Sequence, residues 1–210
     1  VGERYFGLGM KHANLVYVTI STGIGGGIYV DGHLLIGKDG NAHEIGHLII
    51  DPEGRLICGC GKPGHWEAYC SGSGIPKFVR LIIKEKGEDV VSSSLLYRLV
   101  KGNLESITSK TVYDTAKMGD SLALEIVQKI GLLNAIGFAN IINVYDPSLI
   151  TVGGSVALHN EELVLGPIRK YVGKYTINRI PEIKLTPLGD DIVLYGAVAV
   201  AFKKEEIKIL

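Results

Sequence analysis

Short runs of β-branched and aromatic residues fill the first quarter of the chain. Residues 14–20 (NLVYVTI) predict a strand, and residues 27–30 predict a second strand that leads to a turn at 31–32. A glycine cluster joins the two, so together they predict a hairpin. Residues 46–50 predict a third strand, which places the strands of this region within 14–50.

Helical periodicity replaces this pattern from residue 75 onward, weakly through residue 101 and strongly after residue 120. Three helices are predicted in this part of the chain, at 121–144, 160–172 and 192–202. A short buried strand is predicted at 149–152 between the first two of them. Strands followed by helix, strand and helix indicate an α/β layered fold with one mixed sheet.

The composition excludes several classes of protein. The chain has 210 residues, 46% of them hydrophobic, and its 22 basic residues balance 22 acidic ones, which suits a water-soluble globular protein. This balance leaves no electrostatic footprint for nucleic acid, so we expect no nucleic-acid partner for this chain. The most apolar stretch, 130–150, is interrupted by asparagines and Asp146, so we expect no membrane span.

Glycines cluster at two points where a ligand could approach the backbone. The first cluster, between the hairpin strands, is Ser21-Thr22-Gly23-Ile24-Gly25-Gly26-Gly27, whose N–H groups and Thr22 hydroxyl could face an anion. An ordinary glycine turn is the alternative. The second, Gly153-Gly154, follows a predicted strand, where open α/β sheets bind ligands, although close packing of a helix on a strand explains it equally well.

Four Cys and His residues are spaced as a structural zinc site requires. They are His47, Cys58, Cys60 and His65. Cys58 and Cys60 are separated by one glycine, too tight for a disulfide, which favours metal binding and a reducing, cytoplasmic compartment. A solvated loop with coincidental cysteines is the alternative.

His43-Glu44-x-x-His47 also matches the zinc-binding helix of metalloproteases. Gly46 lies inside this match, and the apolar residues 48–50 directly after it favour a strand. The two histidines would then not share a helix face, so we set this interpretation aside.

Taken together, these motifs resemble the ROK family of sugar kinases and sugar-responsive repressors. The similarity spans nearly the whole chain and rests on five segments in the same order: GLG at 7–9 with NLVYVTISTGIGGGIYVDG, GNAHEIGH, CGCGKPGHWEAYCSG, ANIINVYDPSLITVGGSVA and LGDDIVLYGAVAVA. The resemblance implies an α/β fold of the actin-like ATPase and ribonuclease-H-like kind, in which helices flank a mixed sheet and a loop binds zinc.

The resemblance also implies roles for particular residues. Sugar hydroxyls would be bound by Glu44, His47 and Glu67, and structural Zn²⁺ by His47, Cys58, Cys60 and His65. The nucleotide, ATP with Mg²⁺, would contact Ser21, Thr22, Gly23, Gly25, Gly26, Gly27, Gly153 and Gly154.

The chain departs from the family pattern at three places. His65 stands where the family usually has a third cysteine, and His43 replaces a small residue before the glutamate. Histidine is an acceptable zinc ligand, so we expect the site to persist. The family's catalytic Asp lies upstream of Val1. We therefore expect residues 1–210 to be the carboxy-terminal lobe of a longer kinase, with strands at 14–50, a zinc and sugar loop at 43–73 and a nucleotide-binding part at 75–210, and to phosphorylate no sugar alone.

The function that the resemblance implies is ATP-dependent phosphorylation of a hexose, with glucose at its 6-hydroxyl as the first choice. A sugar-responsive ROK repressor and an N-acetylhexosamine kinase stay open as alternatives, although the intact glycine hairpin favours a kinase. We expect hexose and nucleotide as ligands and a homodimer or larger homo-oligomer.

Overall fold

A five-stranded mixed sheet forms the centre of the computed structural model, which describes residues 1–209 except for the side chains of residues 88 and 90. The strands are β1 (Leu15–Ile20), β2 (Ile24–Val30), β3 (His33–Leu34), β4 (Leu149–Gly153) and β5 (Glu182–Leu185). Their spatial order is β3-β2-β1-β4-β5. β1 pairs antiparallel with β2 and parallel with β4, and β5 adds a second parallel pair.

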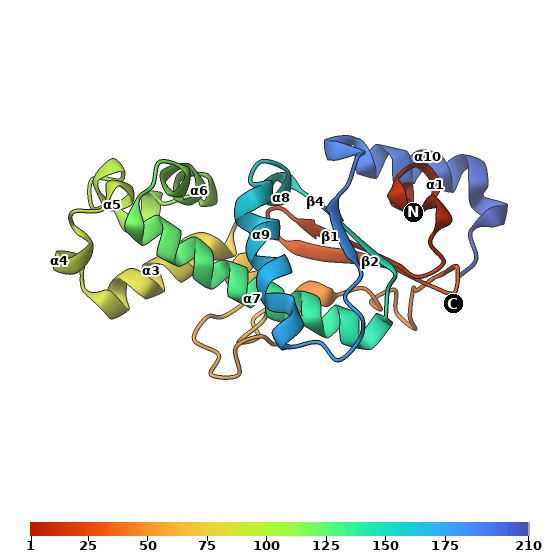
Figure 1. The fold of residues 1–210 in the computed structure, drawn as a ribbon, viewed down its shortest axis with the longest axis horizontal. Helices are drawn as coiled ribbons and strands as arrows, with labels where there is room; N and C mark the ends of the chain where they lie inside the picture. Colours follow the sequence, from red (N-terminus) through yellow and green to blue (C-terminus); the bar gives the residue numbers. More distant parts are fainter. Residues whose placement is uncertain (210) are drawn as a thin grey trace.

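Helices cover both faces of this sheet (Figure 1). Val16, Val18 and Ile20 are fully buried on the face toward the long helix α7 (Ser121–Tyr145). Because side chains alternate along a strand, Leu15 and Tyr17 point to the other face, where α1 (Gly2–Phe6) and α10 (Ile192–Lys203) lie. The predicted α/β class, a mixed sheet flanked by helices, is therefore confirmed.

The remaining helices are α2 (Glu67–Cys70), α3 (Gly74–Lys86), α4 (Glu88–Val91), α5 (Leu95–Leu99), α6 (Ser109–Lys117), α8 (Ser155–Leu158) and α9 (Glu161–Tyr171). Of these, α2, α3, α6 and α9 contact α7, whereas α4 packs against α3, α5 packs against α6, and α8 packs against the sheet and α9. Helices α3 to α6 extend the molecule at one end, away from the termini (Figure 1). Asp120 joins this end to α7, because its carboxylate caps α7 at the Ala123 N–H (2.8 Å) and accepts the Leu95 N–H (2.6 Å).

Helix α7 is the core helix that the periodicity predicts at 121–144. It ends at Asp146, whose left-handed backbone (φ 42°) precedes Pro147. Its length and composition would allow it to cross a membrane, but 61% of its most apolar 18-residue window is buried inside the protein. The core helix of a globular fold passes the same test, so this helix is weak evidence for a membrane.

Two sequence predictions in the first quarter of the chain are wrong. Residues 46–50 form no strand in the described structure: Ile45–His47 is a 3-10 turn, and Ile49 is 62% exposed and makes a single bridge, to His65. A Cβ at Gly46 would lie 2.1 Å from the Ile24 carbonyl oxygen, so the chain turns where glycine permits this approach. The second strand begins at Ile24 and not at residue 27, so most of the glycine cluster is strand and only residues 21–23 form the turn.

Candidate functional site

The four predicted zinc ligands come together at the end of the turn Ile45–His47, which contributes His47. Their donor atoms all lie within 4.8 Å of one another. His65 Nδ1 is 3.1 Å from His47 Nδ1 and 3.3 Å from Cys60 Sγ, and Cys58 Sγ is 3.7 Å from His47 Nδ1. A tetrahedral zinc ion needs about 3.4–3.8 Å between its nitrogen and sulfur ligands. The donor set and its spacing therefore fit one zinc ion.

Glycines let the chain fold tightly around these donors. Gly61 (φ 85°) and Gly64 (φ 75°) both have left-handed backbones. A Cβ at Gly64 would also lie 2.2 Å from the Asp51 carbonyl oxygen. The Cys58 N–H donates to the Lys62 carbonyl (2.9 Å), which closes the turn that carries both cysteines.

The surroundings affect the protonation of two of these donors. Burial lowers the pKa of His65, and the nearby His47 lowers it further, so the neutral imidazole that binds metals is favoured. Burial raises the pKa of the Cys58 thiol. A bound cation would oppose this effect, because it stabilises the thiolate.

Two carboxylates adjoin the cluster on separate segments. His47 Nε2 lies 3.5 Å from Glu44 Oε2, so the two ring nitrogens of His47 face the cluster and Glu44 respectively. Glu67, the first residue of α2, has its Oε1 3.7 Å from Cys58 Sγ. The structure thus brings the three predicted sugar ligands, Glu44, His47 and Glu67, to one place beside the metal donors.

The loop before α2 is held in place by contacts of Asp51 and Trp66, two residues that the sequence did not single out. The buried Asp51 carboxylate accepts hydrogen bonds from the Tyr69 hydroxyl (2.6 Å) and from Arg55 Nε (3.0 Å). Trp66 is fully buried, and its indole N–H donates to the buried Asn134 side chain of α7 (2.8 Å). These contacts hold the segment that carries His65 and Glu67 at Trp66 and at Tyr69.

Asp51→Asn is expected to lower the free energy of unfolding by about 1.5–3 kcal/mol near neutral pH, because it weakens hydrogen bonds made to a charge. Burial alone would raise the pKa of Asp51, but the hydrogen bonds from Tyr69 and Arg55 and the charge of Arg55 outweigh it, so the pKa is lowered. The carboxylate therefore stabilises the fold above its unfolded pKa, and this contribution is lost as the pH falls through the lower folded value.

Urea unfolding of wild type and Asp51→Asn at about pH 7 and pH 3 tests this prediction. The difference in stability should shrink in acid. Glu53→Gln, an exposed carboxylate on the same turn, is the matched control and should change stability by less than about 0.5 kcal/mol. An equal difference at both pH values would contradict the role of the Asp51 charge.

The two glycine elements meet on the other side of Glu67. Ser21 Oγ, at the hairpin turn, lies 3.2 Å from Ser155 Oγ, the first residue of α8. Gly154 (φ 86°) approaches β1 so closely that a Cβ would lie 2.6 Å from the Ile20 carbonyl oxygen. The structure thus confirms close helix–strand packing at Gly154, and sequence reasoning had not singled out Ser155.

A pocket of about 440 Å³, called the polar pocket because most of the residues that line it are of polar types, opens next to Ser155, between α6 and α8. Its lining includes Lys110, Tyr113, Lys117, Ser155, His159 and Asn160. The Lys117 ammonium closes one side by donating to the His159 carbonyl (2.9 Å). This pocket lies at the carboxyl end of β4, beside the hairpin turn.

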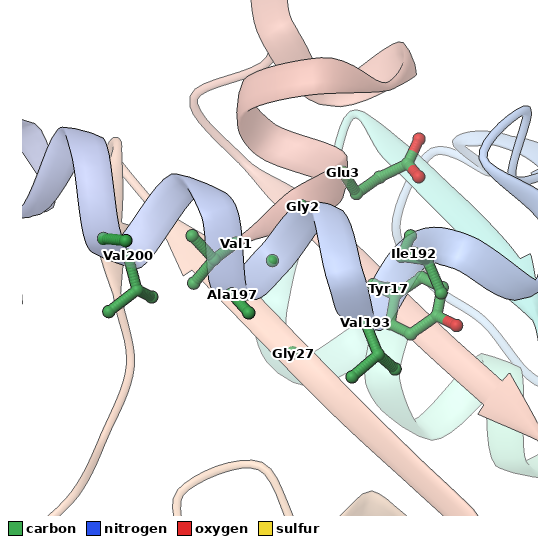
Figure 2. Close-up of a pocket in the computed structure, with 11 residues that line it drawn as sticks. Val1, Gly2, Glu3, Tyr17, Gly27, Ile192, Val193, Ala197 and Val200 are labelled. Carbon is green, nitrogen blue, oxygen red and sulfur yellow. The ribbon is translucent and has the colours of Figure 1, made fainter.

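A larger cavity of about 620 Å³ lies between α1, α10 and the sheet, and it has a different character. Figure 2 shows Val193, Ala197 and Val200 of α10 lining it, with the Glu3 carboxylate turned away from them. That carboxylate is already used, since it accepts from the Leu8 N–H (2.8 Å) and the Thr186 hydroxyl (2.7 Å). An apolar lining of this kind does not suit a sugar or a phosphate.

The protease interpretation of His43 and His47 is excluded by the backbone. Residues 45–47 form a single 3-10 turn, so the two histidines share no α-helix face. His43 Nδ1 lies 3.9 Å from Glu44, while His47 faces the cysteines. Of the two reasons taken from the sequence, the predicted strand at 46–50 is wrong, but Gly46 does interrupt the match, and the conclusion holds.

Comparison with known proteins identifies the family. Residues 1–204 match the sequence profile of the ROK family. A glucokinase from Pyrobaculum calidifontis is 38% identical over 193 residues, which are 92% of this chain and 59% of the relative. A xylose repressor from Bacillus subtilis is 30% identical over 179 residues, 85% of this chain and 41% of the repressor.

A solved structure agrees with these sequence matches. The crystal structure of a ROK family glucokinase from Streptomyces griseus, in complex with glucose and AMPPNP, is 32% identical and has a TM-score of 0.79 over 95% of this chain and 64% of that one. This similarity confirms the predicted actin-like ATPase fold. The chain spans about three fifths of the length of the glucokinases it matches. It belongs to the ROK family.

Proposed function

We propose that the protein containing this chain transfers the γ-phosphoryl group of ATP to a hexose, with glucose phosphorylated at its 6-hydroxyl. The similarity to a glucokinase whose structure holds both glucose and AMPPNP carries this proposal. Within it, residues 1–210 act as the carboxy-terminal lobe.

In this proposal the sugar is bound by Glu44, His47 and Glu67. Two carboxylates on different segments can accept hydrogen bonds from neighbouring hydroxyls of one ring, and bonds to a charged acceptor are stronger than neutral ones. Zinc on His47, Cys58, Cys60 and His65 would have four protein ligands and no open position, so its role would be structural. It would fix the direction of the His47 ring, whose Nε2 faces Glu44.

The nucleotide is proposed to lie on the other side of the hairpin turn. Backbone N–H groups of the turn would face the phosphates, except those of Ser21 and Ile24, which donate to the Gly23 carbonyl and to Glu67, and Mg²⁺ would offset phosphate charge. The predicted set comprises Ser21, Thr22, Gly23, Gly25, Gly26, Gly27, Gly153 and Gly154. The polar pocket between α6 and α8 would then receive the nucleoside, because Ser155 belongs to its lining and contacts the turn.

A coupled assay of the full-length protein with glucose and ATP tests the proposal. Glu44→Gln is expected to raise KM for glucose at least tenfold with a smaller change in kcat, because the lost contact is made in the ground state and the transition state alike. Glu53→Gln is the control and should behave as wild type. No phosphorylation of any tested hexose by the wild type would refute the proposal.

The similarity to a xylose repressor keeps a second function in view. A sugar-responsive repressor would use the same sugar lobe without phosphoryl transfer, so sugar-dependent DNA binding without kinase activity would favour it. Comparing glucose with N-acetylglucosamine and N-acetylmannosamine as substrates tests the amino-sugar alternative. The cytoplasmic location and the homo-oligomeric state stay predictions.

A further inference from the structure

The turn of the glycine hairpin is held by the two ends of α2. At the start of α2, Glu67 Oε2 accepts the Ile24 N–H (2.8 Å). Beyond its end, the Gly72 N–H donates to the Ser21 carbonyl (2.6 Å), and Ser73 donates to the Thr22 carbonyl through both its N–H (3.1 Å) and its hydroxyl (2.8 Å). A movement of α2 therefore moves the turn.

Because glycine has no side chain, Gly23 leaves room beside the turn for the Glu67 carboxylate. A Cβ at this position would lie 2.5 Å from Glu67 Oε2 and 3.3 Å from its carboxyl carbon. The backbone of Gly23 is outside the left-handed region, so space and not conformation requires glycine here. Any larger residue would separate the carboxylate from the turn.

The same turn lies between the two halves of the proposed active site. On one side is Glu67, which also approaches Cys58 of the metal cluster with its other oxygen (3.7 Å). On the other side is Ser155, at the edge of the polar pocket, 3.2 Å from the Ser21 hydroxyl. The Glu67 carboxylate therefore contacts both the Cys/His cluster beside the proposed sugar site and the turn that would face phosphate.

We propose that Glu67 is a positioning residue for the hairpin turn, with Gly23 as the residue that permits this contact, so that sugar and nucleotide each strengthen the binding of the other. This inference rests on the proposed function. A sugar hydroxyl bound to Oε1 fixes the carboxylate and keeps Oε2 on the Ile24 N–H. The turn is then already ordered when the nucleotide arrives, and thermodynamic linkage makes the effect reciprocal.

The coupling is measured by titrating glucose into the full-length protein with and without Mg²⁺ and AMPPNP. We expect the nucleotide analogue to tighten glucose binding roughly fivefold or more in the wild type. In Gly23→Ala, glucose affinity should fall about tenfold and the effect of the analogue should disappear. Equal glucose affinities with and without the analogue in the wild type would overturn the inference, and so would wild-type coupling in Gly23→Ala.

Amide exchange at Ile24 gives a local readout that needs no ligand. Glu67→Ala removes the acceptor and should speed exchange about tenfold, whereas Glu67→Gln keeps a carbonyl oxygen and should restore most of the protection. Gly27→Ala is the matched control in the same hairpin, since a Cβ there has no atom within 4 Å, and it should leave Ile24 exchange unchanged. Unchanged exchange in Glu67→Ala would overturn the inference.

The two experiments separate this inference from the proposed function. A wild-type protein that binds no hexose refutes both the proposed function and the coupling. A protein that phosphorylates glucose but binds glucose and nucleotide independently refutes the coupling alone.

Discussion

Replacing Cys58 and Cys60 by serine is expected to abolish the predicted zinc binding and to raise KM for glucose at least tenfold. The metal cluster connects three segments, because its donors come from the 3-10 turn, the cysteine loop and the residue before Trp66. Glu44 contacts His47 and Glu67 contacts Cys58, so both carboxylates lose a fixed neighbour when the metal is lost. Affinity for the nucleotide in the absence of sugar should change much less, since the polar pocket lies beyond the hairpin turn.

Elemental analysis and steady-state kinetics of the full-length protein check this prediction. Cys70→Ala is the matched control: Cys70 is fully buried, donates to the Ile130 carbonyl and lies outside the cluster, so this variant should keep its zinc even if it is less stable. Retention of zinc in the double variant would show that the cluster is not the metal site. Loss of zinc with unchanged glucose KM would show that the metal does not position the carboxylates.

Sequence reasoning succeeded where one local pattern decides the outcome. The stripe of apolar residues in 121–144 and the Asp146-Pro147 stop gave α7 almost to the residue, because a long amphipathic run leaves few alternatives. Spacing also predicted that His47, Cys58, Cys60 and His65 come together, and their donor atoms lie within 4.8 Å of one another; that they bind zinc stays a prediction. Helix α7 follows from neighbours along the chain, whereas the cluster, which spans residues 47–65, is marked by its residue types.

Predictions from the sequence are wrong where contacts between distant segments determine the local structure. Leu48-Ile49-Ile50 has the composition of a strand, but Gly46 turns the chain against the Ile24 carbonyl, and Ile49 bridges only to His65. Strand β5 was missed because Glu182–Leu185 is short and half polar, and it forms only by pairing with β4. The contacts of Asp51 with Tyr69 and of Glu67 with Ile24 join residues 18 and 43 positions apart, a separation that no local pattern reveals.

The position of the site relative to the core depends on one such long-range contact. Trp66 lies between His65 and Glu67, and its ring rests on α7 at Gly137, edge-on to Phe138. A Cβ at Gly137 would lie 2.5 Å from two atoms of the indole ring. Alanine is normally the better helix former by about 1 kcal/mol, so helix propensity alone would favour it at this position.

Gly137→Ala is therefore expected to destabilise the protein by about 1–3 kcal/mol, because a methyl group forced into a packed core displaces Trp66 or bends α7. The affinity for glucose should fall as well, because Trp66 stands between His65, a predicted metal ligand, and Glu67, a predicted sugar ligand. Gly196→Ala in α10 is the matched control: its Cβ would meet only one atom, at an ordinary 3.5 Å, so it should stabilise by about 0.4–1 kcal/mol. Urea unfolding of both variants and of the wild type measures these changes in the free energy of unfolding. If Gly137→Ala were as stable as Gly196→Ala, the indole ring could not be what holds the loop with His65 and Glu67 against α7, and the contacts of Asp51 and the predicted metal would have to position it.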